Sequence, residues 1–282
     1  MTEIGRFWET WAPYLSYIED NHLDLANIEK LGGIISDPVL IVGAGQGLLV
    51  EQLQKSGHKV DGVDLSPQMV KYAEMRRGLK LIEADARNLP FASKMYNTVI
   101  IATGVVDFLD DDGQIGLIVN EARRVTQDFG KVLVAFVGAH PVAERFARRV
   151  GLITDRGTFN QRKMFELTRL SPWQTLRTFR RDSQMGIFST LREFLMLQMF
   201  LPRKEKEMTK RLAQLWKVAD NPQALIDSAI ESLPYRTEDD VRALFARLRL
   251  PVDRFFDFGN CSVVQIELKG RGVAGRKEQG SS

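Results

Sequence analysis

The sequence has a single cysteine, Cys261, among its 282 residues. One cysteine forms no disulfide within the chain and supplies no cysteine-rich zinc site, and we expect no metal site. Such cysteine usage is typical of a cytoplasmic or redox-indifferent protein. The start of the chain lacks the basic and apolar regions of a signal peptide. No uninterrupted apolar run reaches the roughly 18 residues of a transmembrane helix, so we predict a cytoplasmic protein without a transmembrane segment.

Neither sign of charge predominates over the whole chain, because 39 basic and 36 acidic residues leave a net charge of +3. This balance excludes a strongly basic protein that coats nucleic acid. The charges are nevertheless unevenly distributed. Residues 141–236 hold 18 basic and 10 acidic residues, whereas the rest of the chain holds 21 and 26. The segment 141–236 is therefore the basic part of the molecule, and it is also rich in Phe and Trp.

Short apolar runs alternate with helical patterns through residues 37–140 and again from residue 237 onward. This alternation is typical of βαβ units and a parallel sheet. Continuous apolar runs such as Val39-Leu40-Ile41-Val42 fit strands that are buried on both faces. The predicted strands are residues 39–42, 59–64, 79–83, 98–102, 131–137, 254–258 and 262–268, and the predicted helices between them are residues 48–55, 67–77, 115–125 and 237–248.

The pattern differs between residues 141 and 236, where helix-capping signals repeat and no strand-like run stands out. Near the start of the chain, Phe7, Trp11 and Tyr14 follow a helical spacing that predicts an amphipathic helix docked on another surface. The predicted organisation is an N-terminal helical segment at residues 1–36, an α/β core at residues 37–140 and 237–269, a helical insert at residues 141–236 between the fifth and sixth strands, and a disordered tail at residues 270–282.

A glycine-rich turn follows the first predicted strand, with Gly43, Gly45 and Gly47 in the order G-x-G-x-G. Glycines allow a tight turn and let a ligand lie against bare backbone. Leu48 stands where the dinucleotide fingerprint G-x-G-x-x-G needs a small residue, so a pyrophosphate ligand is disfavoured. No Gly-Lys-Ser/Thr follows, which excludes a P-loop. A turn that only links a strand to a helix stays an alternative for this motif taken alone.

Two acidic residues follow the next predicted strands. Asp64 ends the second strand, 17 positions after Gly47, where an acid in nucleotide-binding sheets accepts hydrogen bonds from ribose hydroxyls. Asp85 follows the third strand at the carboxyl edge, where open α/β sheets bind ligands. Its carboxylate can accept a hydrogen bond from an exocyclic amine. Either acid alone could be an ordinary surface residue, but their order after a glycine turn indicates a nucleoside site.

In this order, the glycine turn, Asp64 and Asp85-Ala86 resemble the class I S-adenosylmethionine-dependent methyltransferases. Leu89-Pro90-Phe91, before the fourth strand, is frequent in the subgroup that methylates small molecules and quinones. The resemblance covers residues 37–140 and, more weakly, residues 237–268. It implies a Rossmann-like α/β fold with a mainly parallel seven-stranded sheet and helices on both faces. It also implies S-adenosylmethionine as the cofactor and methyl transfer as the reaction.

The resemblance further implies which residues contact the cofactor. The glycine turn would face its methionine and ribose, Asp64 the ribose hydroxyls, and Leu65 the adenine ring. Asp85 would accept the adenine amine, and the backbone of Ala86 would donate to the base. The implied set is Tyr14, Gly43, Ala44, Gly45, Gly47, Asp64, Leu65, Asp85, Ala86, Thr103 and Gly104, of which Thr103 and Gly104 would line the methionine end.

The candidate catalytic residue is His140, which follows the fifth strand at the carboxyl edge of the sheet. Methyl transfer is an in-line displacement in which the enzyme mainly holds the acceptor and excludes water, but a phenol or amine can need a general base. A loop or capping role is the alternative for His140. Tyr14 is included because an N-terminal helix often closes the cofactor site in this family, although packing of that helix explains Tyr14 equally well. His22 and His58 are expected at the surface.

Three features depart from the family pattern: Ile41, Asn97 where an acid often opens the fourth strand, and Gln127-Asp128-Phe129-Gly130 where Lys-Pro-Gly-Gly is usual. An acid usually stands two residues before the first glycine and helps to hold the ammonium group of the cofactor, whereas this chain has Ile41. The predicted function is S-adenosylmethionine-dependent methylation, on O, N or C, of a small or lipid-like acceptor with or without an anionic group. The alternative is a catalytically silent protein of the same fold that acts as a scaffold or partner subunit.

The insert allows several interpretations. Its Phe, Trp and Arg residues suit a lid over a bulky, apolar acceptor, and they suit a surface for homodimerisation equally well. Arginine pairs such as Arg148-Arg149 and Arg180-Arg181 could also face anionic lipid. An RNA acceptor is less expected, because the excess of positive charge is modest and no RNA-binding module is recognisable.

Overall fold

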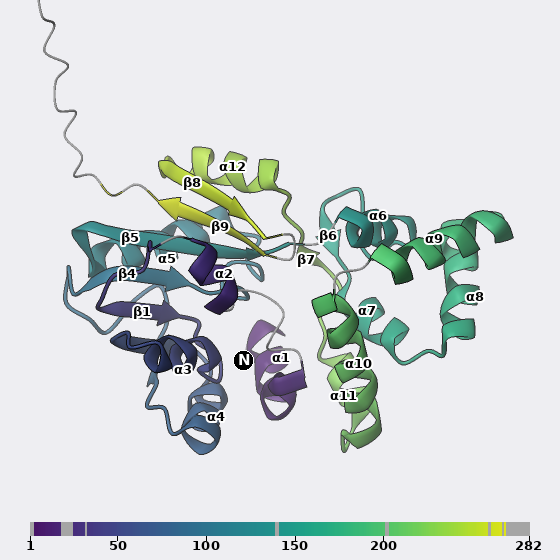
Figure 1. Cartoon of the computed structure of the whole chain (residues 1–282), viewed down its shortest axis with the longest axis horizontal. Coiled ribbons are helices and arrows are strands. Elements are labelled where there is room, and N and C mark those ends of the chain that lie inside the picture. Colours follow the sequence, from purple (N-terminus) through teal and green to yellow (C-terminus); the bar gives the residue numbers. More distant parts are fainter. Residues whose placement is uncertain are drawn as a thin grey trace, which may run out of the picture.

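The computed structural model describes residues 3–17, 25–31, 33–138, 141–200, 203–258, 261–266 and 268. A seven-stranded sheet with helices against both faces forms the larger part, and the insert extends beyond one end of that sheet (Figure 1). The N-terminal helix α1 (Glu3–Trp11) lies between these two parts. Within the described residues, no helix is long and apolar enough to cross a membrane.

The sheet has the predicted Rossmann-like, mainly parallel topology. Its strands lie in the order β3 (Ile82–Glu83), β2 (Val60–Asp64), β1 (Val39–Val42), β4 (Tyr96–Ile101), β5 (Thr126–Val137), β9 (Cys261–Ile266) and β8 (Val252–Asp257). The strand β9 runs antiparallel to both of its neighbours, and the other described pairs are parallel. The order therefore reverses between β1 and β4, and open α/β sheets bind their ligands at the carboxyl ends of the strands at such a reversal.

Alternate residues of the strands face two different helical layers. One layer consists of α2 (Leu25–Lys30), α3 (Leu48–Lys55) and α4 (Pro67–Arg77), and the other of α5 (Asp112–Val125) and α12 (Glu238–Arg247). Within β1, Ile41 packs against the first layer and Leu40 against the second. All four residues of β1 are buried. A parallel strand that is covered on both faces is apolar throughout, which made this strand recognisable in the sequence.

The N-terminal segment forms α1 and then the 3-10 helix η1 (Ala12–Tyr17). Phe7 and Trp11, whose spacing predicted a docking helix, are both buried. Trp11 stacks on Phe165 of the insert, with 4.4 Å between ring centroids. The predicted helix is therefore present, and its apolar face meets the insert.

The insert is mainly helical, as predicted. Its elements are α6 (Pro141–Arg149), β6 (Thr158–Phe159), α7 (Gln161–Thr168), α8 (Pro172–Ser183), α9 (Ile187–Phe200), α10 (Arg203–Val218), α11 (Pro222–Asp227) and β7 (Leu233–Pro234). The expectation of no strand here was wrong, because β6 and β7 pair antiparallel. Strands of two residues are too short to produce an alternating pattern. Phe146 and Phe194 both pack on Phe179, so part of the aromatic content forms a core of the insert itself.

Candidate cofactor and acceptor site

The candidate site lies at the carboxyl edge of the sheet, at the reversal between β1 and β4. The turn from β1 to α3 carries Gly43 and Gly47, with φ angles of +74° and +80°. A Cβ at Gly43 would lie 2.1 Å from Cγ2 of Val105, and one at Gly47 would lie 2.5 Å from Cδ1 of Leu79. Both positions therefore need glycine for the backbone conformation and for close packing.

Asp64, at the end of β2, is in direct contact with this turn. Its Oδ2 accepts the backbone N–H of Gly45 at 2.8 Å, and its Oδ1 accepts the N–H of Ser66 at 2.9 Å. Burial of the carboxyl raises the pKa of Asp64 to about 6, although these hydrogen bonds act in the opposite direction. Two motifs that are 17 residues apart in the sequence thus form one unit.

The ribose and adenine parts of S-adenosylmethionine fit this unit. A carboxylate offers about four acceptor positions, and the described N–H groups of Gly45, Leu65 and Ser66 leave part of that capacity to a sugar hydroxyl. The neighbouring Leu65 side chain is 63% exposed. An exposed apolar side chain beside a partly buried carboxylate suits a nucleoside whose sugar is polar and whose base is flat and largely apolar.

Asp85, after β3, is held by a residue two positions further along. Its Oδ1 accepts both the backbone N–H and the Nε–H of Arg87 at 2.9 Å, and Arg87 also donates from Nη2 to Oδ2. The hydrogen bond from Arg87 lowers the pKa of Asp85. An adenine amine would therefore share this carboxylate with Arg87 or displace it. The Arg87 side chain is 45% exposed, so it can move aside into solvent.

The predicted methionine end is formed by the loop that follows β4. Within it, Gly104 has a φ angle of +86°, and the indole of Trp8 on α1 lies 3.3 Å from the position of a Cβ on Gly104. Phe108 of the same loop lies 5.1 Å from Trp8 between ring centroids. The preceding residue, Thr103, is partly buried. Aromatic side chains from α1 and this loop therefore cover the edge of the sheet where the acceptor was expected.

Comparisons with known proteins agree with this geometry. Residues 39–130 match the family model described as a methyltransferase domain. A demethylmenaquinone methyltransferase of Corynebacterium urealyticum is 31% identical over 144 residues, which are 51% of this chain and 60% of that relative. The chain therefore contains a methyltransferase domain at residues 39–130. The cofactor of such a domain is S-adenosylmethionine, and the roles of Asp64 and Leu65 in holding it stay a prediction.

Solved structures show the same fold as this methyltransferase. The PH0226 protein of Pyrococcus horikoshii superposes with a TM-score of 0.53 at 16% identity, over 93% of this chain and 99% of that one. A SAM-dependent methyltransferase of Methanosarcina mazei superposes with a TM-score of 0.50 at 14% identity, over 87% and 99%. At such identities the likeness shows the fold alone. The match to the curated relative spans about 60% of the relative's length.

Asp107 is a partly buried residue that the sequence did not single out. Its carboxylate accepts the backbone N–H of Gly104 at 2.7 Å and that of Val137 at 2.9 Å, and burial raises its pKa. Arg236, at the end of the insert, donates to the carbonyls of Val106, at 3.2 Å, and Leu109. Several acids stand close together in this loop, so its sequence contains no signal that marks Asp107.

Gln46 is a second residue that the motif analysis missed. It is buried within the glycine turn, and its side-chain amide donates to the carbonyl of Ala12 in η1. Arg76 of α4 donates to Gln46 Oε1 at 3.0 Å and to the carbonyl of Pro13 at 2.7 Å. Polar side chains thus fix η1 on the glycine turn.

The structure places Ile41, which stands in the usual position of an acid, fully within the apolar layer beneath α3. Glu9 of α1 accepts the hydroxyl of Ser66 at 3.0 Å. Ser66 follows Asp64 by two residues and caps α4 through the N–H of Met69. The chain therefore has the Glu9 carboxylate close to Asp64 and an aliphatic side chain at the position where the family pattern predicts an acid.

Two predicted site residues are not confirmed by these contacts. His140 and His22 lie outside the described residues, so the catalytic role of His140 stays a prediction. The Tyr14 hydroxyl accepts the backbone N–H of Asp220 at 3.4 Å, and its ring packs on the aromatic cluster of the insert. These contacts favour the alternative in which Tyr14 packs the N-terminal segment. Among the described residues, no group of three or more His, Cys, Asp or Glu side chains could hold a metal ion.

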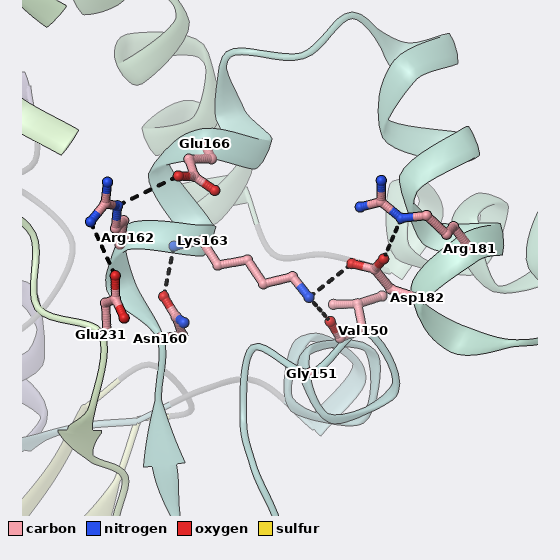
Figure 2. A pocket seen from close by; sticks show the side chains of 9 residues that line it. All are labelled: Val150, Gly151, Asn160, Arg162, Lys163, Glu166, Arg181, Asp182 and Glu231. Atoms are coloured by element: carbon pink, nitrogen blue, oxygen red, sulfur yellow. Dashed lines mark hydrogen bonds and ion pairs between the residues drawn. The ribbon is translucent and has the colours of Figure 1, made fainter. Parts of the chain in front are cut away.

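A polar hollow of about 760 Å³ lies within the insert of the methyltransferase, among α6, α7 and α8 (Figure 2). Its charges are paired with one another. Lys163 Nζ lies 2.8 Å from Asp182 Oδ2, and Arg162 forms ion pairs with Glu166 and Glu231. Because each of these cations already has an acidic partner, the hollow has little unbalanced charge with which to attract an anionic acceptor.

Proposed function

We propose that the methyltransferase transfers a methyl group from S-adenosylmethionine to a small or lipid-like acceptor with an aromatic body, of the quinol class. The observation that carries this proposal is the hydrogen bond between Asp64 and Gly45. This bond joins the glycine turn to the end of β2, and the rings of Trp8 and Phe108 lie against each other beside Gly104 in the loop after β4. The name of the relative from Corynebacterium urealyticum, a demethylmenaquinone methyltransferase, supports an acceptor of this class.

The residues of the chain hold the reactants and shield them from water. When bound, S-adenosylmethionine supplies a sulfonium methyl group for in-line displacement. Asp64 would hold the ribose hydroxyls, and the indole of Trp8 over Gly104 would exclude water from the methionine end. Phe108 would offer its ring to the acceptor, since offset or edge contacts between aromatic rings are favourable.

We propose His140 as the group that accepts a proton from a hydroxyl of the acceptor. A phenol becomes a better nucleophile, at oxygen or at the adjacent ring carbon, when a base removes its proton. The support is the position of His140 three residues after Val137, which ends β5 at the carboxyl edge. The pH dependence of turnover tests this role, because His140→Gln should remove the acidic limb of the profile while leaving cofactor affinity unchanged.

We propose that the insert is the lid over the acceptor. Two contacts support this role, since Trp11 of α1 stacks on Phe165 of the insert and Arg236 binds the loop that carries Gly104. The same contacts thus hold both the proposed lid and the methionine end of the site. An acceptor held between them would be enclosed by aromatic side chains from α1, from the loop and from the insert.

Calorimetric titration with S-adenosylmethionine and with S-adenosylhomocysteine tests the cofactor site. Both should bind, and a folded chain that binds neither would overturn the proposal.

Incubation with quinols, simple phenols and primary amines, followed by mass spectrometry, tests the acceptor class. Methylated quinols are expected, whereas methylation of amines alone would contradict the proposed class. Binding without any turnover would favour the silent scaffold, which the buried Ile41 and the Arg87-bound Asp85 also suit.

A further inference from the structure

An apolar stripe of exposed side chains runs along α9. This helix lies in the part of the insert that is far from the sheet (Figure 1). Four residues of the stripe recur at intervals of four, which places them along one side of a helix. The exposed fractions of its side chains lie between 43% and 85%. The apolar stripe consists of Ile187, Phe188, Leu191, Leu195 and Met199.

Thr190 and Phe194, on the side of α9 that adjoins the apolar stripe, face the insert. Thr190 is buried, and its hydroxyl donates to the carbonyl of Gly186 at 3.0 Å. Phe194 packs on Phe179 of α8, with 5.9 Å between ring centroids. The helix is therefore held in the insert through Phe194, while the side chains of the apolar stripe stay exposed. Exposed apolar side chains gathered in this way mark an interaction surface more often than isolated ones do.

Cationic side chains lie at both ends of the apolar stripe and along it. Arg149 Nη1 lies 3.9 Å from Sδ of Met185, just before α9 begins. Lys206 Nζ donates to the carbonyl of Met199 at 3.4 Å, in the last turn of α9. Arg192 is exposed next to Leu191. The stripe is therefore an apolar surface with a cationic rim, in a segment, residues 141–200, that holds eleven basic and five acidic residues.

We propose that the apolar stripe docks the methyltransferase on the surface of a lipid bilayer that contains anionic headgroups. A helix of this kind lies in the plane of the interface, with its apolar side chains at the boundary between headgroups and acyl chains. The cationic rim would meet the lipid phosphates, each nearby basic residue adding to the attraction. This inference does not depend on the proposed acceptor, since docking needs neither cofactor nor substrate.

The charges favour a membrane over a second copy of the chain. In a twofold-symmetric dimer, the same patch meets itself. Because Arg149 lies at one end of the apolar stripe and Lys206 at the other, both parallel and antiparallel pairings would bring cations together. Like charges across an interface oppose association. An anionic lipid surface, in contrast, can attract all the cations of the rim at the same time.

Flotation of the full chain with vesicles tests the proposal without cofactor or acceptor. Vesicles of phosphatidylcholine and phosphatidylglycerol in equal parts should bind the chain, and vesicles of phosphatidylcholine alone should bind it less. The double variant Phe188→Glu with Leu195→Glu should bind about tenfold less, because two charges would have to enter the interface. Phe129→Glu is the matched control and should bind like the wild type, since Phe129 is 84% exposed but lies on β5 of the core.

Charge reversal tests the cationic rim separately. Lys206→Glu should weaken binding to the mixed vesicles by at least about fivefold, whereas Lys80→Glu, at an exposed position of the core, should not. Thermal unfolding by circular dichroism checks that all variants fold. The proposal is overturned if the wild type does not bind mixed vesicles at low salt, or if the stripe variant binds them equally well. Sedimentation gives a further test. The proposal is overturned if the wild type is a dimer and the stripe variant is a monomer, while the wild type does not bind the vesicles.

Discussion

The carboxylate of Asp107 accepts the backbone N–H of Val137 at 2.9 Å, which joins the loop after β4 to the end of β5. Arg236 binds the carbonyls of Val106 and Leu109 in the same loop. The chain enters the insert shortly after Val137 and leaves it at Arg236. Both connections of the insert are therefore fixed to the loop that forms the predicted methionine end. A change in the position of the insert would consequently change the shape of the site.

Removing the Asp107 carboxylate should lower the free energy of unfolding. Asp107→Ala leaves the N–H groups of Gly104 and Val137 without their acceptor, and each such loss costs about 1–3 kcal/mol. Denaturation in urea measures the change. The control is Asp110→Ala, in the same loop but exposed, which should alter the free energy of unfolding by less than about 0.5 kcal/mol. Equal effects of the two variants would contradict the role assigned to Asp107.

The order of the strands and helices of the core could be predicted because burial on both faces leaves continuous apolar runs. The predicted helix at residues 67–77 coincides with α4, whose start is marked by Ser66 as cap and Pro67 in the first turn. The predicted strand at residues 79–83 is reduced to Ile82 and Glu83. There the N–H of Leu79 donates to the carbonyl of Ala73 and so completes the end of α4 rather than a strand.

The candidate site could be predicted only where its parts follow a fixed order along the chain. Asp64 and the glycine turn were recognised because they end consecutive strands, and the structure joins them. Gln46 and Asp107 were not, because their importance arises from partners 34 and 30 residues away. The hydrogen bonds from Arg87 to Asp85 were also missed, since the sequence does not show whether an acid and a base two residues apart in a loop form an ion pair.

Replacing the Asp64 carboxylate should weaken cofactor binding. Asp64→Asn keeps the shape but removes the charge, and loss of a charged hydrogen-bond partner costs about 1–3 kcal/mol of binding free energy. Calorimetric titration with S-adenosylhomocysteine measures the change. Asp61→Asn is the matched control, because Asp61 lies on the same strand but accepts the hydroxyl of Tyr96 instead. Unchanged affinity in a folded Asp64→Asn chain would contradict the assignment.

Cofactor affinity should depend on pH through Asp64. Its pKa is raised to about 6 by burial, and the ionised form accepts the ribose hydroxyls, so affinity should fall as the pH drops through 6. If the ionised form alone binds, the affinity at pH 5 should be about tenfold below its plateau at neutral pH. Titrations with S-adenosylhomocysteine at several pH values measure this dependence. It should vanish in Asp64→Asn and persist in Glu9→Gln, which alters the acid that contacts Ser66; a flat wild-type profile would refute it.

Adding a methyl group at Gly43 should destabilise the fold more than the same change at Gly57. Both residues have a positive φ angle, +74° and +91°, so alanine at either position carries a backbone cost of about 1–2 kcal/mol. At Gly43 the new Cβ would also lie 2.1 Å from Cγ2 of Val105, whereas at Gly57 the space is open.

Urea denaturation of Gly43→Ala, Gly57→Ala and the double variant Gly43→Ala with Val105→Ala separates backbone strain from the clash. The smaller side chain at residue 105 removes the clash. The loss in free energy of unfolding of the double variant should therefore be smaller than the sum of the losses of the two single variants. Equal losses at Gly43 and Gly57 would show instead that Val105 moves aside freely, and that this turn is not tightly packed.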